Sequence, residues 1–200
     1  MNTYRHWDER YGESDFAYGK EPNAFFKDCL ETLLPGTLLL AAEGEGRNAF
    51  WALQKGFEVK AYDGSSVGKT KALTLAVGYE KMLDYQIASH LGYTCPKESI
   101  DVLGIIYAHI ESENRKAVHQ RLAECLKPGG HLILEAFSKK QLGNTSGGPK
   151  SLDMLYDLEE IKLDFPGFYW KVSVAQSRTL NEGKYHQGNA ELIQLFGRKQ

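Results

Sequence analysis

The chain has 200 residues, of which 42% are hydrophobic and 25% charged, and its formal net charge is −2. This composition is typical of one globular α/β domain, and the nearly neutral charge argues against nucleic acid or an anionic membrane as a partner. No apolar run approaches the ~18 residues of a membrane helix, and the polar first ten residues do not resemble a signal peptide. The three widely spaced cysteines, Cys29, Cys95 and Cys125, argue against a disulfide framework or a zinc site and fit a reducing, cytoplasmic location.

Short apolar runs alternate with segments of helical spacing over the first two-thirds of the chain. A helix is expected at residues 22–34, before a Pro-Gly turn. Buried strands are expected at residues 37–42, 57–62, 82–89, 100–107 and 131–137, with helices between them at residues 48–55, 67–77 and 114–126. This alternation predicts a single-domain, doubly wound, Rossmann-like α/β fold with a parallel sheet and helices on both faces.

The last third of the chain breaks the alternation. A turn is expected at residues 127–130, just before the fifth strand. Beyond that strand we expect a glycine-rich loop, a helix and two strands at residues 138–150, 152–163, 168–179 and 190–196. The two strands predict a C-terminal antiparallel hairpin on the otherwise parallel sheet.

A glycine turn follows the first expected strand. Gly44 and Gly46 tolerate unusual backbone angles, and the helix after them presents N–H groups that suit a carboxylate or phosphate. Asp63 ends the second strand, where a carboxylate can accept hydrogen bonds from ribose hydroxyls. This order predicts a nucleotide site at the carboxyl ends of the strands. The alternative is a plain tight turn, with Asp63 as a helix cap.

Two other nucleotide motifs match less well. Residues 64–70 end in Gly-Lys-Thr like a phosphate-binding loop, but three residues separate their glycines where the motif requires four. Gly44, Gly46 and Ala49 are compatible with the looser dinucleotide fingerprint, so a dinucleotide-dependent oxidoreductase is a third, weaker hypothesis.

The stretches Ala42-Glu43-Gly44-Glu45-Gly46-Arg47-Asn48-Ala49 and Ala61-Tyr62-Asp63-Gly64-Ser65 resemble the first two motifs of class I S-adenosylmethionine-dependent methyltransferases. The Gly-Glu-Gly-Arg-Asn form is similar to the tellurite-resistance-type branch and its bacterial relatives. Residues 7–11, 18–23, 126–130 and 182–188 also fit those relatives, so the resemblance covers nearly the whole chain. It implies a seven-stranded sheet whose last strand is antiparallel, with S-adenosylmethionine as cofactor and S-adenosylhomocysteine as product.

The resemblance also implies a set of cofactor contacts. The turn of Glu43, Gly44, Glu45 and Gly46 is expected against the methionine part, and Asp63 at the ribose. The candidates near the adenine are Ser65 or Ser66 and the pair His90 and Leu91. Tyr107 is expected to line the methionine pocket, and Tyr11, Tyr18 and Gly19 to form a lid. Two further candidates, Asn48 and Gly64, lie inside the motifs themselves.

Three positions depart from the family pattern. Leu40 and Ala42 stand where the family usually has an acid and a glycine, and Glu43 is the candidate to supply the missing charge toward the cofactor's ammonium. His90 stands where an acid usually follows the third strand, and an imidazole cannot fully replace a carboxylate. The alternative function is therefore a cofactor-binding or regulatory protein with this fold and little or no activity.

Methyl transfer depends mainly on alignment of the acceptor, and a base is needed only when the acceptor must lose a proton. His109, after the fourth strand, and His186, in the hairpin, are the candidate bases. Their structural alternatives are a histidine bonded to backbone and a turn residue. Arg47, directly after the glycine turn, is the candidate for an anionic acceptor.

The expected organisation is an N-terminal lid (residues 1–24), a cofactor-binding core (36–137) and a substrate side (138–200), whose glycine loop at 147–149 lies near the acceptor. We expect a small-molecule acceptor, no metal, and a monomer or homodimer. The aromatic residues of the lid have a second interpretation as a core-packing or dimer strip: Tyr4, Trp7, Tyr11, Phe16 and Tyr18.

Overall fold

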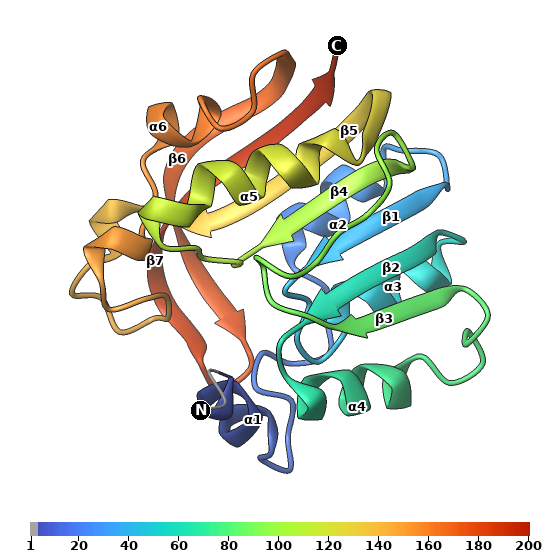
Figure 1. The fold of residues 1–200 in the computed structure, drawn as a ribbon. Coiled ribbons are helices and arrows are strands. Elements are labelled where there is room, and N and C mark those ends of the chain that lie inside the picture. The colour runs from blue at the N-terminus through green and yellow to red at the C-terminus, as the bar shows by residue number, and fades with distance from the viewer. Residues whose placement is uncertain (1–3) are drawn as a thin grey trace.

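A computed structural model describes residues 4–200, so the first three residues of the expected lid lie outside the description. Its centre is a seven-stranded sheet of order β3-β2-β1-β4-β5-β7-β6 (Figure 1). The strands are β1 (Thr37–Ala41), β2 (Glu58–Asp63), β3 (Leu83–Ile87), β4 (Ile100–Ile106), β5 (Leu126–Phe137), β6 (Phe168–Glu182) and β7 (His186–Lys199). Strands β1 to β5 are parallel, and β7 is antiparallel to both β5 and β6. The predicted fold class and terminal hairpin are confirmed.

Helices cover both faces of the sheet. Packed against one face are α2 (Ala24–Leu30), α3 (Arg47–Gln54) and α4 (Ser66–Leu75), and against the other α5 (Ser112–Glu124) and α6 (Leu158–Lys162). Helix α1 (Arg5–Tyr11) lies at the lower edge in Figure 1, close to α4 and to the end of the β6–β7 hairpin. Two short 3₁₀ helices, η1 (Lys139–Gln141) and η2 (Leu152–Met154), follow β5.

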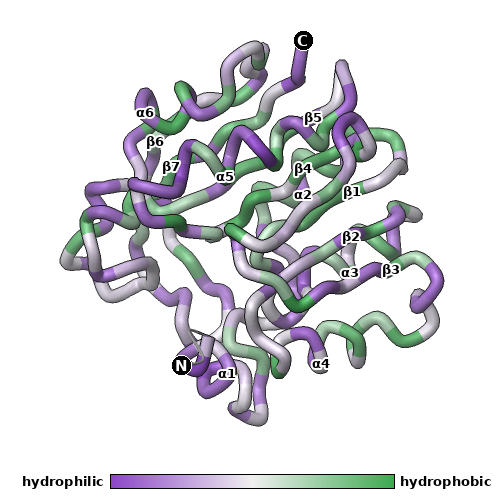
Figure 2. The backbone as a smooth tube through the Cα atoms, in the orientation of Figure 1, coloured by the Kyte–Doolittle hydropathy of each residue, from purple (hydrophilic) through white to green (hydrophobic). Residues whose placement is uncertain are grey.

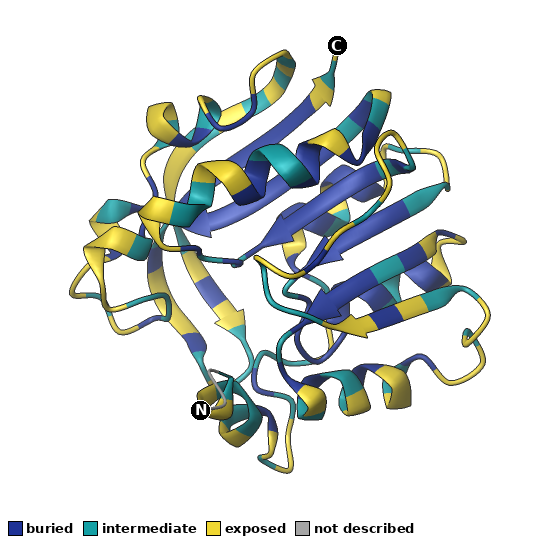
Figure 3. Ribbon diagram, viewed as in Figure 1, coloured by how far each residue is buried: buried dark blue, intermediate teal, exposed yellow. Residues whose placement is uncertain are grey.

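The central strand β1 explains why the sequence pattern identified the sheet. Its residues Leu38, Leu39 and Leu40 are each at most 1% exposed, because helices cover both of its faces. A strand buried on both faces is continuously apolar rather than alternating. Figure 2 shows the hydrophobic centre of the sheet, and Figure 3 shows the same strands as its buried part.

The strand order reverses between β1 and β4, which are neighbours in the sheet. Directly after these strands, Ala42 (φ 51°) and Tyr107 (φ 54°) adopt left-handed backbone conformations that are unusual for residues other than glycine. Such strained positions persist only where the surrounding structure holds them, and they cluster at functional sites. The carboxyl ends of β1 and β4 therefore mark the place to look for a site.

The helix predicted at residues 152–163 is wrong in its extent. The chain forms η2, then an extended segment at Leu155 and Tyr156, and α6 begins only after Asp157, whose side chain accepts hydrogen bonds from the helix N-terminus. Tyr156 is fully buried, accepts a hydrogen bond from the Ile110 backbone and donates one to the Ala108 carbonyl. Burial of this tyrosine against β4 interrupts the helix.

Two predicted boundaries in the second half also differ. The turn expected at residues 127–130 is an irregularity within β5, because Leu126 and His131 pair with Ile100 and Val102 of β4. The terminal strands are longer than predicted and meet in a tight turn at residues 183–185. Cross-strand pairing continues through polar residues, which carry no strand signal in the sequence.

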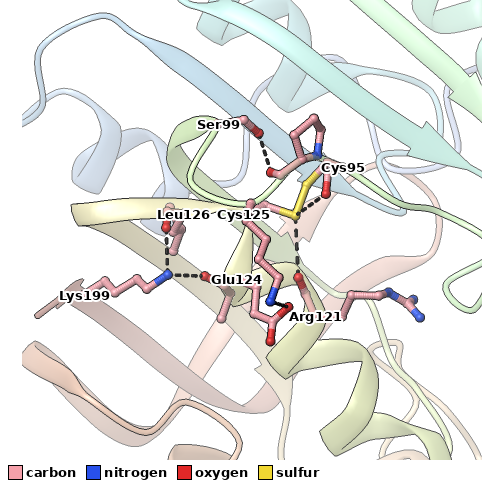
Figure 4. The surroundings of a disulfide bond; sticks show 10 residues. Cys95, Ser99, Arg121, Glu124, Cys125, Leu126 and Lys199 are labelled. Carbon is pink, nitrogen blue, oxygen red and sulfur yellow. Dashed lines mark hydrogen bonds and ion pairs between the residues drawn. A yellow bond between two sulfur atoms is a disulfide. The ribbon is translucent and has the colours of Figure 1, made fainter.

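The expectation of unpaired cysteines is wrong. Cys95 and Cys125 form a disulfide, shown in Figure 4, and Cys29 is buried and free. The two cysteines are 30 residues apart in the sequence, so their spacing does not indicate a pair. In the structure, the backbone N–H groups of Ser99 and Ile100 both donate to the Cys125 carbonyl, which places the loop before β4 beside the end of α5. The cysteines thus no longer support a reducing compartment. Among residues 4–200, no helix is long and apolar enough to cross a membrane.

Gly46 offers a test of how tightly the glycine turn is packed. A Cβ added at Gly46 (φ 89°) would lie 2.5 Å from the Cβ of Ala72 in α4, whereas a Cβ added at Gly78 (φ 92°) would meet nothing within 4 Å. Both Ala substitutions carry the left-handed backbone cost of about 1–2 kcal/mol, and crowding adds about 1–3 kcal/mol at position 46 alone. We expect Gly46→Ala to lower the free energy of unfolding, measured with urea, by about 2 kcal/mol more than Gly78→Ala. Equal losses would show that α4 moves freely away from the turn.

Candidate active site

A cavity of about 1170 Å³ opens at the carboxyl ends of the parallel strands, between α1 and the β6–β7 hairpin. It brings together residues that are far apart in the sequence. The predicted site residues that line it are Tyr11, Tyr18, Gly19, Glu43, Gly44, Glu45, Arg47, Asn48, Asp63, Gly64, His90, Leu91, Tyr107, His109 and His186. Gly46, Ser65 and Ser66 are not among the residues that line it.

The Glu43 side chain holds the glycine turn against α3. Its Oε1 accepts hydrogen bonds from the backbone N–H groups of Asn48 and Ala49, both at 2.8 Å, and its Oε2 accepts from Asn48 Nδ2 at 3.2 Å. Burial raises the pKa of Glu43 to about 7, although these bonds oppose the rise. Two of the helix donors that the sequence seemed to offer to a ligand are thus occupied by the chain's own carboxylate.

Asp63 meets the same turn from β2. Its Oδ2 accepts from the Gly44 backbone N–H at 3.0 Å and its Oδ1 from the Ser65 N–H at 2.8 Å. A carboxylate has about four acceptor positions, so Asp63 keeps capacity for hydroxyl donors in the cavity. Burial raises its pKa to about 6. Gly44 (φ 61°) allows this close approach, and a Cβ there would lie 2.6 Å from the Tyr11 hydroxyl.

The serines expected near the adenine have a structural role. Ser65 caps α4 by accepting from the Gly68 N–H at 3.0 Å, and it donates to Asp8 Oδ1 at 2.6 Å. Ser66 begins α4 and is exposed. The ring of Tyr4 instead lies directly against Gly64, in the space that a side chain at position 64 would fill.

His90 and Leu91 lie in the loop after β3 and line the same end of the cavity. The Nδ1 atom of His90 is 3.1 Å from the Tyr62 hydroxyl, and burial lowers the pKa of His90 to about 4. Arg121 of α5 donates to the carbonyl of His90. With the disulfide of Figure 4, this contact fixes the loop to α5.

The N-terminal segment is attached over the cavity by two basic side chains. Lys71 of α4 donates at 2.8 Å to Glu45 and to the carbonyls of Glu13 and Asp15, and Glu45 also accepts from the Ala17 N–H at 2.7 Å. Arg10 donates to the Tyr18 hydroxyl at 2.8 Å and lies over the rings of Trp7 and Tyr185. Tyr4, Trp7, Tyr11 and Tyr18 line the cavity, whereas Phe16 lies under Lys20 and Lys71.

Both ring nitrogens of His109 are bonded to backbone. Nδ1 lies 2.6 Å from the Met154 carbonyl, which requires Nδ1–H to donate, and Nε2 accepts from the Phe137 N–H at 3.2 Å. Burial lowers the pKa of His109 to about 4. This geometry corresponds to the structural alternative for His109, because neither nitrogen is free to take a proton.

His186 has a different environment. Its Nδ1 lies 3.3 Å from Glu182 Oε2, and that same oxygen accepts from Arg47 Nη2 at 2.8 Å. Burial would raise the pKa of Glu182, but the bond to His186 and the charge of Arg47 outweigh it and lower the pKa to about 2. Arg47 also donates to the Tyr18 carbonyl at 3.1 Å. The arginine expected to meet an anionic acceptor is therefore already paired.

Sequence reasoning missed three residues at or beside the site, of which Phe137 lines the cavity and the other two, Glu182 and Glu135, support residues that line it. Glu182 pairs with His186 across the tight hairpin, a relation visible only once the strand register is known. Phe137 ends β5 and stacks with both Tyr107 and His109. Glu135, 1% exposed, accepts from the hydroxyl of Tyr107 at 2.7 Å. The motif at residues 182–188 contains both Glu182 and His186, and the tight hairpin places these two residues opposite each other.

Residues 39–134 match the family model of the methyltransferase domain. Many solved structures share the fold, and three with low sequence identity illustrate it. One concerns the conversion of a disulfide bond into a thioacetal group during echinomycin biosynthesis (TM-score 0.75, 16% identity, 98% of this chain and 88% of that chain). Another is TehB from Haemophilus influenzae (TM-score 0.74, 12% identity, 98% of this chain and 66% of that chain).

The third is the Burkholderia thailandensis 1,6-didemethyltoxoflavin-N1-methyltransferase, solved with 1,6-didemethyltoxoflavin and S-adenosylhomocysteine (TM-score 0.61, 16% identity, 88% and 78% of the two chains). No curated protein sequence matches the chain. The chain therefore has the class I methyltransferase fold, and the central part of its sheet lies within the residues that match the methyltransferase-domain model. The class I methyltransferase resemblance predicted from the glycine turn is confirmed at the level of the fold, which TehB shares.

The pKa of His109 predicts a pH-dependent stability. The folded chain binds fewer protons at this site than the unfolded chain between pH ~6.5 and ~4, so its stabilising contribution is lost as the pH falls through that window. A shift of this size corresponds to about 3 kcal/mol. We expect the stability advantage of the wild type over His109→Asn to shrink by about that amount between pH 7 and 4 in urea titrations. The exposed His6→Asn is the control, and a constant wild-type advantage over His109→Asn would contradict the assignment.

Proposed function

We propose that this chain is an S-adenosylmethionine-dependent methyltransferase with a small-molecule acceptor. The observation that carries the proposal is the Asp63 carboxylate, held by the backbone of the Gly44 turn where the strand order reverses. Ligands of open α/β sheets bind at such points. The cavity of about 1170 Å³ has room for a nucleotide and an acceptor together.

The residues present fit S-adenosylmethionine, which supplies a methyl group on a positively charged sulfur. Asp63 retains acceptor positions for the ribose hydroxyls, while Gly44 allows the Tyr11 hydroxyl of the proposed lid to pack closely against the turn. His90 and Leu91 border the adenine end, and Tyr107 borders the methionine end. Glu43 is the candidate for the ammonium group, because its carboxylate lines the cavity.

His186 is the residue that we assign as the base for acceptors that must lose a proton. Its Nδ1 faces Glu182, so the proton is taken at Nε2, and the carboxylate stabilises the charged ring that results. Arg47 fixes Glu182 in this position. Glu182 and Arg47 thus act as positioning residues, and His109 holds the end of β5 to η2 through its two backbone bonds.

The proposed organisation follows the sequence prediction: a lid, a cofactor-binding core and a substrate side in a single domain, acting in the cytoplasm as a monomer or homodimer, without nucleic acid or membrane partners. A second candidate is a regulatory protein that binds the cofactor without turnover. It is favoured by the occupation of the α3 donors by Glu43 and by Leu40, which is buried in the core where the family has an acid.

Calorimetric titration with S-adenosylhomocysteine tests the cofactor site. We expect binding to the wild type and a loss of at least about tenfold in affinity for Asp63→Ala, because two ribose hydroxyls lose their shared acceptor. Asp84→Ala, at an exposed position on β3, is the matched control and should bind like the wild type. Absence of binding to the wild type at ~1 mM would overturn the proposed function, and unchanged affinity of Asp63→Ala would overturn the ribose assignment.

Arg10 allows a separate test of the lid. We expect Arg10→Leu to weaken S-adenosylhomocysteine binding about fivefold, mainly through faster dissociation, because the variant loses the bond to Tyr18 and the contacts with Trp7 and Tyr185. The control is Arg5→Leu on the same helix, where an exposed pair with Glu9 is lost. Stopped-flow fluorescence of the lid tryptophan measures the rates. Equal dissociation rates for the two variants would mean that α1 does not close the site.

A further inference from the structure

The cavity divides into two parts with different surroundings. The carboxyl ends of β1 and β2 and the loop after β3 form the nucleotide part, around Gly44, Asp63 and His90. The other part, which we name the acceptor half, is bordered by five aromatic or imidazole rings from the segment after β4, the end of β5, the hairpin and the N-terminal segment: Tyr18, Tyr107, His109, Phe137 and His186.

The rings of the acceptor half form a continuous wall. Tyr107 and His109 each stack on Phe137 with an interplanar angle of 25° and centroid distances of 4.9 and 5.7 Å. His186 stands edge-on to Tyr107 at 4.6 Å and lies 4.4 Å from Tyr18. Flat, apolar ligands are bound by stacked and edge-to-face contacts of this kind.

The loop at residues 147–149 follows this wall closely. A Cβ at Gly147 would lie 2.6 Å from His186 Cδ2, and a Cβ at Gly148 would lie 2.8 Å from Phe137 Cγ. The backbone of Gly148 and the ring of Pro149 line the cavity beside the rings. Glycine at both positions therefore allows the loop to pack directly against His186 and Phe137, where a larger side chain would collide with the rings.

The acceptor half offers little to an anion. Burial lowers the pKa of both His109 and His186, which disfavours the positively charged form of each ring. Arg47 is paired with Glu182, and the two charges neutralise each other. The exposed mouth carries two acids, Glu111 and Glu113, and one cation, Lys150, whose amine donates to the Asn144 carbonyl. Beside the rings an anion meets Arg47 already paired with Glu182, so it would lose its hydration there without gaining a free ion-pair partner.

We propose that the acceptor half binds a neutral, planar heteroaromatic molecule, and that oxyanions are poor ligands there. This inference rests on the proposed function, because the bound molecule is a methyl acceptor only if the chain is a methyltransferase. The wall of rings supplies the stacking surface, and Nε2 of His186 supplies a polar contact for a ring N–H or S–H group. The aromatic lining and the paired charges together favour such a ligand over an aliphatic thiol or an inorganic anion.

The test compares matched ligands by calorimetry with the S-adenosylhomocysteine complex. We expect 2-mercaptopyridine to bind at least about tenfold more tightly than 2-mercaptonicotinate, which adds one carboxylate to the same ring. The affinity for 2-mercaptopyridine should also exceed the affinity for 3-mercaptopropionamide, a neutral aliphatic thiol, and that for sodium tellurite, in each case by at least about tenfold. Equal or tighter binding of the carboxylate or of tellurite would overturn the inference, as would absence of 2-mercaptopyridine binding at ~1 mM.

A charge variant sharpens the comparison. Glu182→Gln removes the counter-ion of Arg47 in a side chain of the same shape, so the ratio of the affinity for 2-mercaptonicotinate to that for 2-mercaptopyridine should rise about tenfold. Glu191→Gln removes the same charge from β7 outside the cavity and should change neither affinity. An unchanged preference in a folded Glu182→Gln protein would contradict the proposed role of the Arg47–Glu182 pair.

The two proposals fail separately. If S-adenosylhomocysteine binds and the neutral heteroaromatic probe does not, the proposed function stands and this inference falls. If S-adenosylhomocysteine does not bind, the proposed function falls, and the same ligand comparison on the free protein judges the acceptor half. Should Glu182→Gln fail to fold, the wild-type comparison decides.

Discussion

The site depends on the capping of α3 by Glu43. Its carboxylate accepts two backbone hydrogen bonds from the first turn of the helix, which fixes the path of the chain between β1 and α3. A buried carboxylate at a helix N-terminus is favoured by the helix dipole and by otherwise unpaired N–H groups. With the turn held from one side by Glu43 and from the other by Asp63, the Gly44 backbone has one position, and the nucleotide part of the cavity takes its shape from it.

Each buried acid around the cavity has its own partners, and together they determine its electrostatics. Glu45 meets Lys71 and the N-terminal segment, and Glu182 meets Arg47 and His186. The exposed mouth carries two acids and one cation. Beside the rings of the acceptor half the charges neutralise each other in pairs, so an anion finds no free ion-pair partner there.

Much of the fold could be predicted because β1, α3 and β2 follow local rules: continuous apolar residues, glycines and one acid at a strand end. The rest depends on contacts between distant residues. Burial of Tyr156 divides the helix expected at residues 152–163, and the approach of Cys95 to Cys125 follows from the path of the loop before β4. Ser65 has the right position for a ligand contact, yet its hydroxyl caps α4. Composition and spacing cannot distinguish these two uses of a serine.

The two histidines show the same limit at the level of chemistry. His109 and His186 carry the same side chain and both line the cavity, but backbone groups occupy both nitrogens of His109, whereas His186 has a carboxylate on one side only. That carboxylate belongs to Glu182, which also bonds to Arg47 beside the glycine turn. The hairpin and the turn are thus linked by one ion pair across 135 residues of sequence. A change in the turn therefore reaches His186 in the hairpin through Arg47 and Glu182, which link the nucleotide part of the cavity to the acceptor half.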